Sequence, residues 1–291
     1  MHLLPHLGPL AAATALLLAA CTSSSPDSSG RDIGSPRSGP TDRPASAATR
    51  PAARPYSYLA LGDSVAVGTG AQDPNTGGYV PLLAALLRDR AGCDDERDCP
   101  LVTRNLATSG ATTATVLQQT LPSLRTLLRS TPAPPPVRLV TLTVGGNDVF
   151  GPVLLSCALE PTSAACATAA GAAVATAGRG VDAVLDQLDT AVPDAVVAVT
   201  AYYDPLPSCR LAALSPLAVQ VLEGDGTRDG LNDVLRAVAA RHGAVVVETA
   251  TLLTERADLV GGDDCLHPSG QGHRKIARAF DAAVGARVTG G

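Results

Sequence analysis

The stretch VRLVTLTVGGND, residues 137–148, holds a β-rich apolar run that ends in two glycines and two polar residues. A nearly continuous apolar run of this length is typical of a strand buried on both faces. Strands that alternate with helices predict a parallel sheet with helices on both sides. We therefore expect an α/β domain, a three-layer α/β/α fold with a parallel sheet of about five strands. The other four expected strands cover residues 56–61, 101–107, 195–203 and 244–250.

Five segments between or after these runs carry apolar residues at the spacing of an amphipathic helix. Pro122 lies inside the second segment and predicts a kink or break there. Gly243 ends the fourth segment and predicts a C-terminal cap. The five expected helices cover residues 78–90, 111–130, 180–192, 230–243 and 269–284.

Residues 1–20 predict an export signal. Leu7 to Ala20 is an apolar stretch as long as a signal-peptide core and shorter than a membrane span. The small residues of LAAC, before Cys21, resemble a bacterial lipobox and predict a lipid on Cys21, although no Lys or Arg precedes the apolar run. Plain secretion and a short membrane anchor are the alternatives. The Ser- and Pro-rich residues after Cys21 predict a disordered linker, so we divide the chain into 1–20, 21–54 and 55–291.

Composition excludes one class of partner and indicates the compartment. A net charge of −5, with no basic cluster in the expected folded part, argues against nucleic acid as a partner. Six cysteines remain beside Cys21, and an even number in an exported domain predicts disulfides. Six cysteines allow many pairings. The chain has no C-x-x-C pair, which disfavours a zinc site. Pairing of neighbours would join Cys93 to Cys99, Cys157 to Cys166 and Cys209 to Cys265.

Polar segments with flanking glycines follow four of the five expected strands. In sheets of this kind, function collects just past the carboxyl ends of the strands, so we expect these segments to meet. The residues concerned are Gly62, Asp63 and Ser64 after the first strand, Gly110 after the second, Asn147 after the third, and Asp264 and His267 after the fifth.

Ser64 is the candidate nucleophile, and a serine hydroxyl needs an adjacent base. Two of the five histidines lie in the signal. His242 is expected to be a surface residue at a helix end, and His273, in an amphipathic helix beside two basic residues, is expected to be exposed. His267 is therefore the candidate base, in a loop before Pro268. Ser64 is also expected to open the first helix, where it would be able to act as the N-cap.

Asp264 precedes His267 by three positions, and this spacing lets its carboxylate hold one ring nitrogen while the other faces the serine. Asp263 is the competing acid, with a turn residue as its alternative role. The whole segment DDCLH also allows a polar turn or a metal site. The metal site is disfavoured because Cys265 is expected in a disulfide and no further ligand cluster is evident. We expect no metal and no cofactor.

Acyl transfer also requires hydrogen-bond donors for an oxyanion. The backbone N–H groups of Ser64 and Gly110 and the side-chain amide of Asn147 are the candidates. Taken singly, Gly110 would be a turn glycine, and Asn147 a turn or N-cap residue. Their combination with a serine and a histidine favours an oxyanion hole.

The ordered set of GDS (62–64), a glycine block at Gly110, GGND (145–148) and D-x-x-H (264–267) resembles the SGNH or GDSL-type hydrolases. The resemblance extends over residues 56–270 and most closely concerns secreted actinobacterial esterases and lipases with three disulfides. It implies a flavodoxin-like three-layer fold and metal-free hydrolysis of esters or thioesters. The first block departs from the family pattern at one position, where Val65 replaces the leucine of GDSL.

We therefore expect a serine hydrolase that cleaves carboxylic esters, an esterase or lipase, through an acyl-enzyme at Ser64. An acyltransferase or a carbohydrate deacetylase on the same residues is the enzymatic alternative. A non-catalytic surface lipoprotein is the alternative of another class. The expected partners are a small-molecule or lipid ester and, through the lipid on Cys21, a membrane. The expected location is outside the cell, as a lipoprotein on the outer face of the cytoplasmic membrane or in secreted form.

Overall fold

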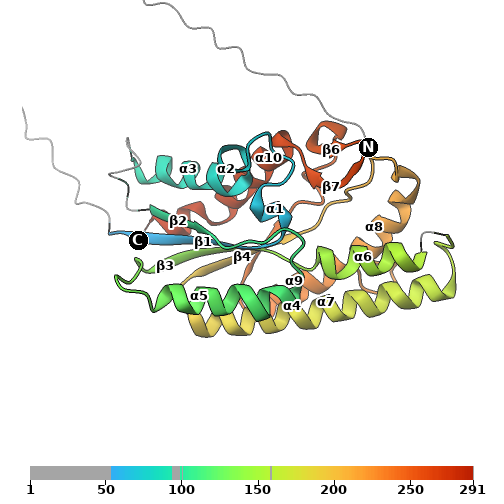
Figure 1. Ribbon diagram of the computed structural model, residues 1–291, viewed down its shortest axis with the longest axis horizontal. Helices are drawn as coiled ribbons and strands as arrows, with labels where there is room; N and C mark the ends of the chain where they lie inside the picture. The colour runs from blue at the N-terminus through green and yellow to red at the C-terminus, as the bar shows by residue number, and fades with distance from the viewer. Residues whose placement is uncertain (1–53, 94–98, 100, 158, 291) are drawn as a thin grey trace, which may run out of the picture. The chain divides into compact units, whose positions relative to one another are not determined.

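The computed structural model describes residues 54–290 except 94–98, 100 and 158 (Figure 1). The expected signal, Cys21 and all of the linker but Arg54 lie outside the described residues. Five parallel strands form the main sheet in the order β2-β1-β3-β4-β5, the flavodoxin-like order, which confirms the predicted fold class. These strands are β1 (Tyr56–Gly62), β2 (Leu101–Asn105), β3 (Val137–Thr143), β4 (Val196–Ala201) and β5 (Val245–Glu248).

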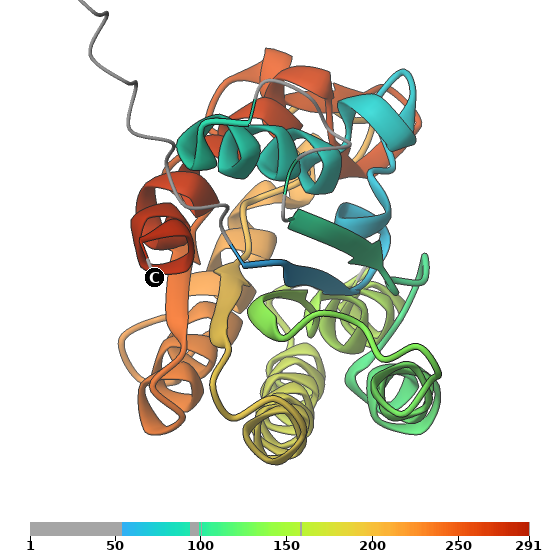
Figure 2. The same cartoon turned by 90° about the vertical axis from the view of Figure 1, so that its left-hand side faces the viewer.

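Helices cover both faces of this sheet, which gives three layers, as Figure 2 shows end-on. One face carries α3 (Tyr79–Ala91), α10 (Gly270–Phe280) and α11 (Ala286–Thr289). The opposite face carries α5 (Leu121–Leu128), α7 (Ala164–Ala191) and α9 (Leu231–Arg241).

Strand β1 shows why the sheet is buried on both sides. Its residues are all buried, and they alternate between two apolar clusters, because successive side chains of a strand point to opposite faces. Leu59 and Leu61 pack with the cluster of α5 and α7, whereas Tyr58 and Ala60 pack with that of α3 and α10. The hydroxyl of Tyr58 lies 3.0 Å from Thr141 Oγ1 on β3, so this buried polar group has a partner.

Several elements differ from the sequence prediction. Helix α7 begins sixteen residues before the expected 180, at Ala164, because its Ala-rich first half has high helix propensity without an amphipathic pattern. A π-helical segment, Val116–Thr120, precedes α5, and Pro122 in the first turn of α5 confirms the predicted break. Helix α4 (Thr113–Thr115) falls within the helix expected at 111–130. The elements that were not expected include α11 and also α2 (Pro74–Gly77), α6 (Gly146–Cys157), α8 (Ser215–Glu223), β6 (Leu259–Gly261) and β7 (Asp264–Pro268).

The six cysteines other than Cys21 form three disulfides between neighbours: Cys93–Cys99, Cys157–Cys166 and Cys209–Cys265. The second joins the end of α6 to the first turn of α7. The third joins the segment after β4 to β7 and encloses a sequence separation of 56. Disulfides are typical of exported proteins. Among the described residues, no helix is long and apolar enough to span a membrane.

Candidate active site

Ser64 lies at the end of β1, where the chain turns sharply into the short helix α1 (Ser64–Val67). The turn needs a glycine at position 62, because φ is +124° there and a Cβ would lie 2.0 Å from the carbonyl oxygen of Thr143. The N-cap of α1 is Asp63, whose Oδ1 accepts a hydrogen bond of 3.0 Å from Val65 N. Ser64 therefore opens α1, as expected, but the N-cap is Asp63 and not Ser64. Because Asp63 fills that role, the Ser64 hydroxyl is left for another partner.

That partner is His267, whose Nε2 lies 2.9 Å from Ser64 Oγ. The other ring nitrogen, Nδ1, lies 2.8 Å from Asp264 Oδ2 and 3.0 Å from Oδ1. An ionised carboxylate only accepts hydrogen bonds, so Nδ1 carries the proton and Nε2 accepts from the serine hydroxyl. His267 belongs to β7, which pairs with β6 in an antiparallel hairpin. The expectation that His267 lies in a loop is therefore wrong.

The carboxylate of Asp264 is held by its own turn as well as by the ring. Its Oδ1 accepts hydrogen bonds from the backbone N–H groups of Leu266 at 2.9 Å and His267 at 3.0 Å. Partial burial tends to raise the pKa of Asp264, but these backbone bonds and the His267 ring outweigh it and lower the pKa. Asp264 is therefore ionised at neutral pH. The competing acid, Asp263, is almost fully exposed and faces Arg210 at 3.6 Å.

The three candidate oxyanion donors are placed differently. Ser64 is the first residue of α1, so its N–H has no acceptor inside the helix. Asn147 lies in the first turn of α6 and lines the same hollow as Ser64; its Nδ2 donates to Ala111 O at 3.0 Å, which leaves a second amide hydrogen. Gly110 is exposed, with φ at +76°, and is not part of the lining of that hollow. The next residue, Ala111, nevertheless accepts the hydrogen bond from Asn147 through its carbonyl oxygen.

Sequence reasoning missed the polar cluster behind the serine. The buried carboxylate of Asp63 accepts hydrogen bonds from Tyr202 OH at 2.6 Å and Thr143 Oγ1 at 2.8 Å. Burial raises the pKa of Asp63, although these two hydroxyls and the Val65 N–H oppose the shift. The ring of Tyr202 lies against Gly146, where a Cβ would come within 2.8 Å of it. The Asp in GDS, a favoured N-cap residue, was a signal for Asp63, whereas nothing in the sequence pointed to Tyr202.

The other two histidines of the folded part have different roles. His273 is fully buried, which corrects the expectation that it is exposed. Its Nδ1 accepts from Tyr79 N at 3.3 Å and its Nε2 lies 2.9 Å from Thr69 O, so it joins α10 to α3 and to the segment after α1. Burial lowers the pKa of His273, which keeps the ring neutral.

His242 caps the end of α9, as expected, and its Nδ1 lies 2.7 Å from Asp189 Oδ2 on α7. The pKa of His242 is raised, chiefly by this hydrogen bond. Within the described part of the chain, His242, Asp186 and Asp189 form the one group whose potential metal-ligand atoms lie within 4.8 Å of one another. These side chains are ordinary ion-pair partners at a helix–helix contact.

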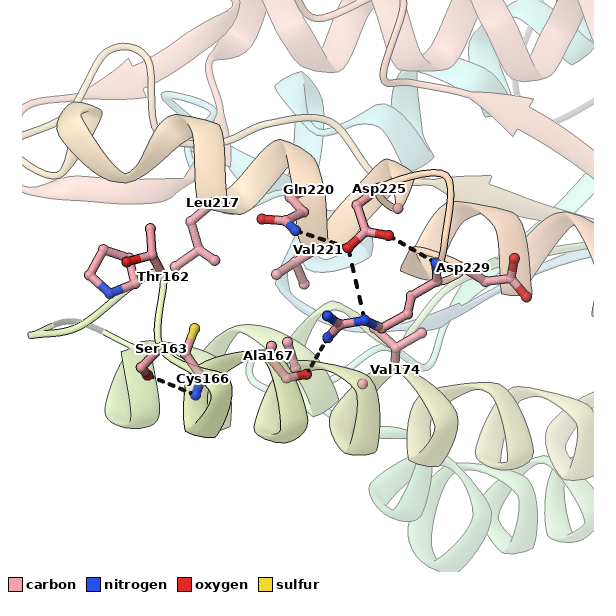
Figure 3. A pocket seen from close by; sticks show the side chains of 15 residues that line it. Thr162, Ser163, Cys166, Ala167, Val174, Leu217, Gln220, Val221, Asp225 and Asp229 are labelled. Atoms are coloured by element: carbon pink, nitrogen blue, oxygen red, sulfur yellow. Dashed lines mark hydrogen bonds and ion pairs between the residues drawn. The ribbon is translucent and has the colours of Figure 1, made fainter.

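Two hollows compete as the reaction site. One of about 360 Å³ is lined by Ser64, Asn147, Phe150 and Tyr202, among others, and so contains the candidate nucleophile. A larger one, of about 790 Å³, lies between α7 and α8 (Figure 3). Three of its polar side chains already pair with one another, because Asp225 contacts both Gln220 and Arg228. The larger hollow contains no serine–histidine pair, so the smaller one is the candidate active site.

A family model for GDSL-like lipases and acylhydrolases matches residues 60–275, which is most of the chain and includes every candidate site residue. The chain belongs to the GDSL-like lipase/acylhydrolase family. This membership confirms the resemblance found in the sequence and makes the chain a carboxylic ester hydrolase. No curated protein sequence matches the chain significantly.

Solved structures with the same fold include two from Streptomyces. The extracellular lipase of Streptomyces rimosus is 24% identical, with a TM-score of 0.57 over 78% of this chain and 99% of that one. Phospholipase A1 of Streptomyces albidoflavus NA297 is also 24% identical, with a TM-score of 0.54 over 78% and 98%. A goat-rumen metagenome lipase is 20% identical, with a TM-score of 0.57 over 78% and 96%. At these identities the likeness supports the three-layer fold alone.

Proposed function

We propose that the chain hydrolyses carboxylic esters through an acyl-enzyme on Ser64, with His267 as general base and acid and Asp264 as the group that orients and stabilises the histidine. The observation that carries the proposal is the continuous pair of hydrogen bonds from Ser64 Oγ to His267 Nε2 and from Nδ1 to Asp264. A triad is recognised by this geometry and these roles. The Asp264 carboxylate is hydrogen-bonded to the His267 ring, whereas the Asp63 carboxylate accepts from the hydroxyls of Tyr202 and Thr143.

The reaction would proceed in two steps. His267 Nε2 takes the proton of Ser64 as Oγ attacks the ester carbonyl carbon, and the carbonyl oxygen becomes an oxyanion. The Ser64 N–H and the free amide hydrogen of Asn147 donate to this oxyanion, and the Gly110 N–H is the third candidate donor. Collapse of the intermediate expels the alcohol, which takes the proton from His267. Water, deprotonated by His267, then attacks the acyl carbon. The bond from this carbon to Ser64 Oγ breaks, the carboxylic acid leaves, and Ser64 Oγ regains its proton from His267.

The proposal is tested by labelling and by turnover in the oxidised, folded protein. We expect a fluorophosphonate probe to label wild type, and Ser64→Ala to abolish both the labelling and the hydrolysis of p-nitrophenyl acetate. Ser123→Ala is the matched control, since this serine is exposed on α5 and only donates to Gln119 O in its own helix region. Labelling that persists in Ser64→Ala would refute the assignment of the nucleophile. Transfer of the acyl group to an added alcohol in preference to water would indicate the acyltransferase alternative.

We further propose that the chain is exported and anchored through a lipid on Cys21. The three disulfides support an oxidising compartment. The anchor is proposed from the LAAC motif, which the structure does not describe. We expect the expressed full chain to partition into the detergent phase of a Triton X-114 extract and Cys21→Ser to move to the aqueous phase. Equal partition of both proteins would refute the lipid anchor and leave plain secretion.

A further inference from the structure

A narrow apolar hollow lies between α6 and α8, next to the candidate active site, and in the folded protein it has room for about one water molecule. All of its lining residues are apolar, and no polar atom is exposed inside it. A hollow of this kind favours an apolar occupant, since a polar group would lose its hydrogen bonds to water there. Besides Phe150 and Val221, its wall consists of Val153, Leu154, Leu206, Leu214, Leu217 and Ala218.

Phe150 is the shared wall between this apolar hollow and the hollow that contains Ser64, because it lines both. It follows Asn147 by three positions on α6, so the two side chains are neighbours on the same face of the helix. Its half-buried ring packs against the main cluster that includes Tyr202 and also against the small cluster around Leu206. The aromatic ring therefore stands where a chain leaving Ser64 would enter the apolar hollow.

The apolar surface ends at Leu217 and Val221, on the side of the hollow away from Phe150. Leu217 and Val221 line both the apolar hollow and the larger hollow of Figure 3. On the far side of these residues lie Gln220, Asp225 and Arg228, which are joined by a hydrogen bond and an ion pair. An apolar chain gains nothing by reaching these groups, because they are polar and already paired with one another.

We propose that Phe150 separates the apolar hollow from Ser64 and thereby limits the length of the acyl chain that the enzyme accepts. The inference rests on the proposed function, since the acyl carbonyl has to lie at Ser64 and Asn147. With Phe150 in the wall, only a short acyl chain fits beside Ser64. Without the ring, the two hollows become continuous, and each further methylene buried is worth about fourfold in kcat/KM.

The test compares hydrolysis of p-nitrophenyl octanoate and acetate, each below its aggregation concentration. The ratio of the two kcat/KM values within one preparation is independent of the fraction of folded enzyme. We expect Phe150→Ala to raise the octanoate-to-acetate ratio by about tenfold or more, a small part of the gain available from several methylenes. Phe150→Leu, which keeps more of the packing, should raise it less.

Two tryptophan substitutions, each made in the Phe150→Ala variant, test where the acyl chain of the substrate lies. Leu217→Trp fills the apolar hollow from α8 and should return the ratio to the wild-type value. Val219→Trp is the control on the same helix, because Val219 is 45% exposed and lines a different hollow beside Asp204 and Arg236. It should leave the raised ratio in place.

A ratio that stays within twofold of wild type in both Phe150 variants, while acetate is still hydrolysed, would overturn the inference and leave the proposed function intact. A raised ratio that Val219→Trp abolishes as fully as Leu217→Trp would also overturn it. Failure of the proposed function has a different signature, because wild type would then show no labelling of Ser64 and no hydrolysis of the acetate ester.

Discussion

Replacing Asp264 by asparagine tests the role of the carboxylate with little change of shape. Two unit charges about 4 Å apart interact by about 4 kcal/mol at an effective dielectric constant near 20. The side chains of His267 and Asp264 are 17% and 28% exposed, and water screens such a pair. Taking half of the interaction leaves about 2 kcal/mol, which is about 30-fold in rate. Loss of the correctly oriented Nδ1–H hydrogen bond adds about 1 kcal/mol. We therefore expect kcat/KM to fall by about 30-fold to 200-fold.

The assay is hydrolysis of p-nitrophenyl acetate at neutral pH, with the labelling of Ser64 and the thermal midpoint measured on the same samples. Asp263→Asn is the matched control: the neighbouring aspartate is 94% exposed and faces Arg210 rather than the histidine, so activity should stay within twofold of wild type. Asp264→Ala should lower the thermal midpoint further than Asp264→Asn, because it also removes the acceptor of two backbone N–H groups. Activity of Asp264→Asn within threefold of Asp263→Asn would show that the carboxylate charge is not needed.

The other predictions concern the groups that support the site and the fold. Asp63→Ala should lower the free energy of unfolding by about 2–4 kcal/mol in urea titrations, because it removes a helix cap and the acceptor of buried hydroxyls, whereas Asp63→Asn should cost less. Replacing Cys209 and Cys265 by serine should lower kcat/KM and remove about 4 kcal/mol of stability by the chain-entropy estimate; unchanged activity would contradict the first part. Because burial lowers the pKa of His273, the unfolded chain binds its proton more tightly, and stability should fall as the pH drops below 6.5; His273→Asn should lose this dependence. The raised pKa of His242 has the opposite sign: its stabilisation is complete below pH 6.5 and is lost as the pH rises through the folded-state pKa, which His242→Gln should abolish in the same titrations.

The main sheet could be predicted from the sequence because its strands are apolar on both faces. The run at 137–145 contains β3 (Val137–Thr143), and the other four runs each overlap one of the remaining strands to within one or two residues at each end. Helix α6 was missed because Gly151 and Pro152 interrupt its pattern. The hairpin of β6 and β7 was missed because strands of three and five residues carry too few alternations to stand out.

The prediction of the candidate site succeeded for residues that follow strand ends and failed for residues whose positions depend on tertiary packing. Ser64 and Asn147 follow the carboxyl ends of β1 and β3, so the topology of the parallel sheet brings them to one edge. His267 lies in the hairpin of β6 and β7 outside this sheet, and tertiary contacts bring it to Ser64. The wrong prediction that His273 is exposed could have been avoided. His273, Ile276 and Phe280 recur at helical spacing and form the buried face of α10, whereas the basic neighbours of His273 had suggested exposure. Tyr202 could not be predicted, since its contact with Asp63 joins positions 139 residues apart.

Within the serine–histidine–aspartate set, the distance between Ser64 and His267 is the one that depends on long-range contacts of the fold. Asp264 and His267 lie three residues apart in one hairpin, so their contact is local and survives any movement of that hairpin as a unit. Ser64 and His267 are 203 residues apart, and only tertiary contacts hold them at 2.9 Å. The contacts that fix the hairpin include the Cys209–Cys265 disulfide and the hydrogen bond of 2.7 Å from Tyr203 OH to Leu266 O. Loosening either contact should therefore weaken the serine–histidine hydrogen bond before the histidine–aspartate hydrogen bond. We expect kcat to fall in the loosened variant. Adding Asp264→Asn to that variant should still lower the kcat of the enzyme that remains active.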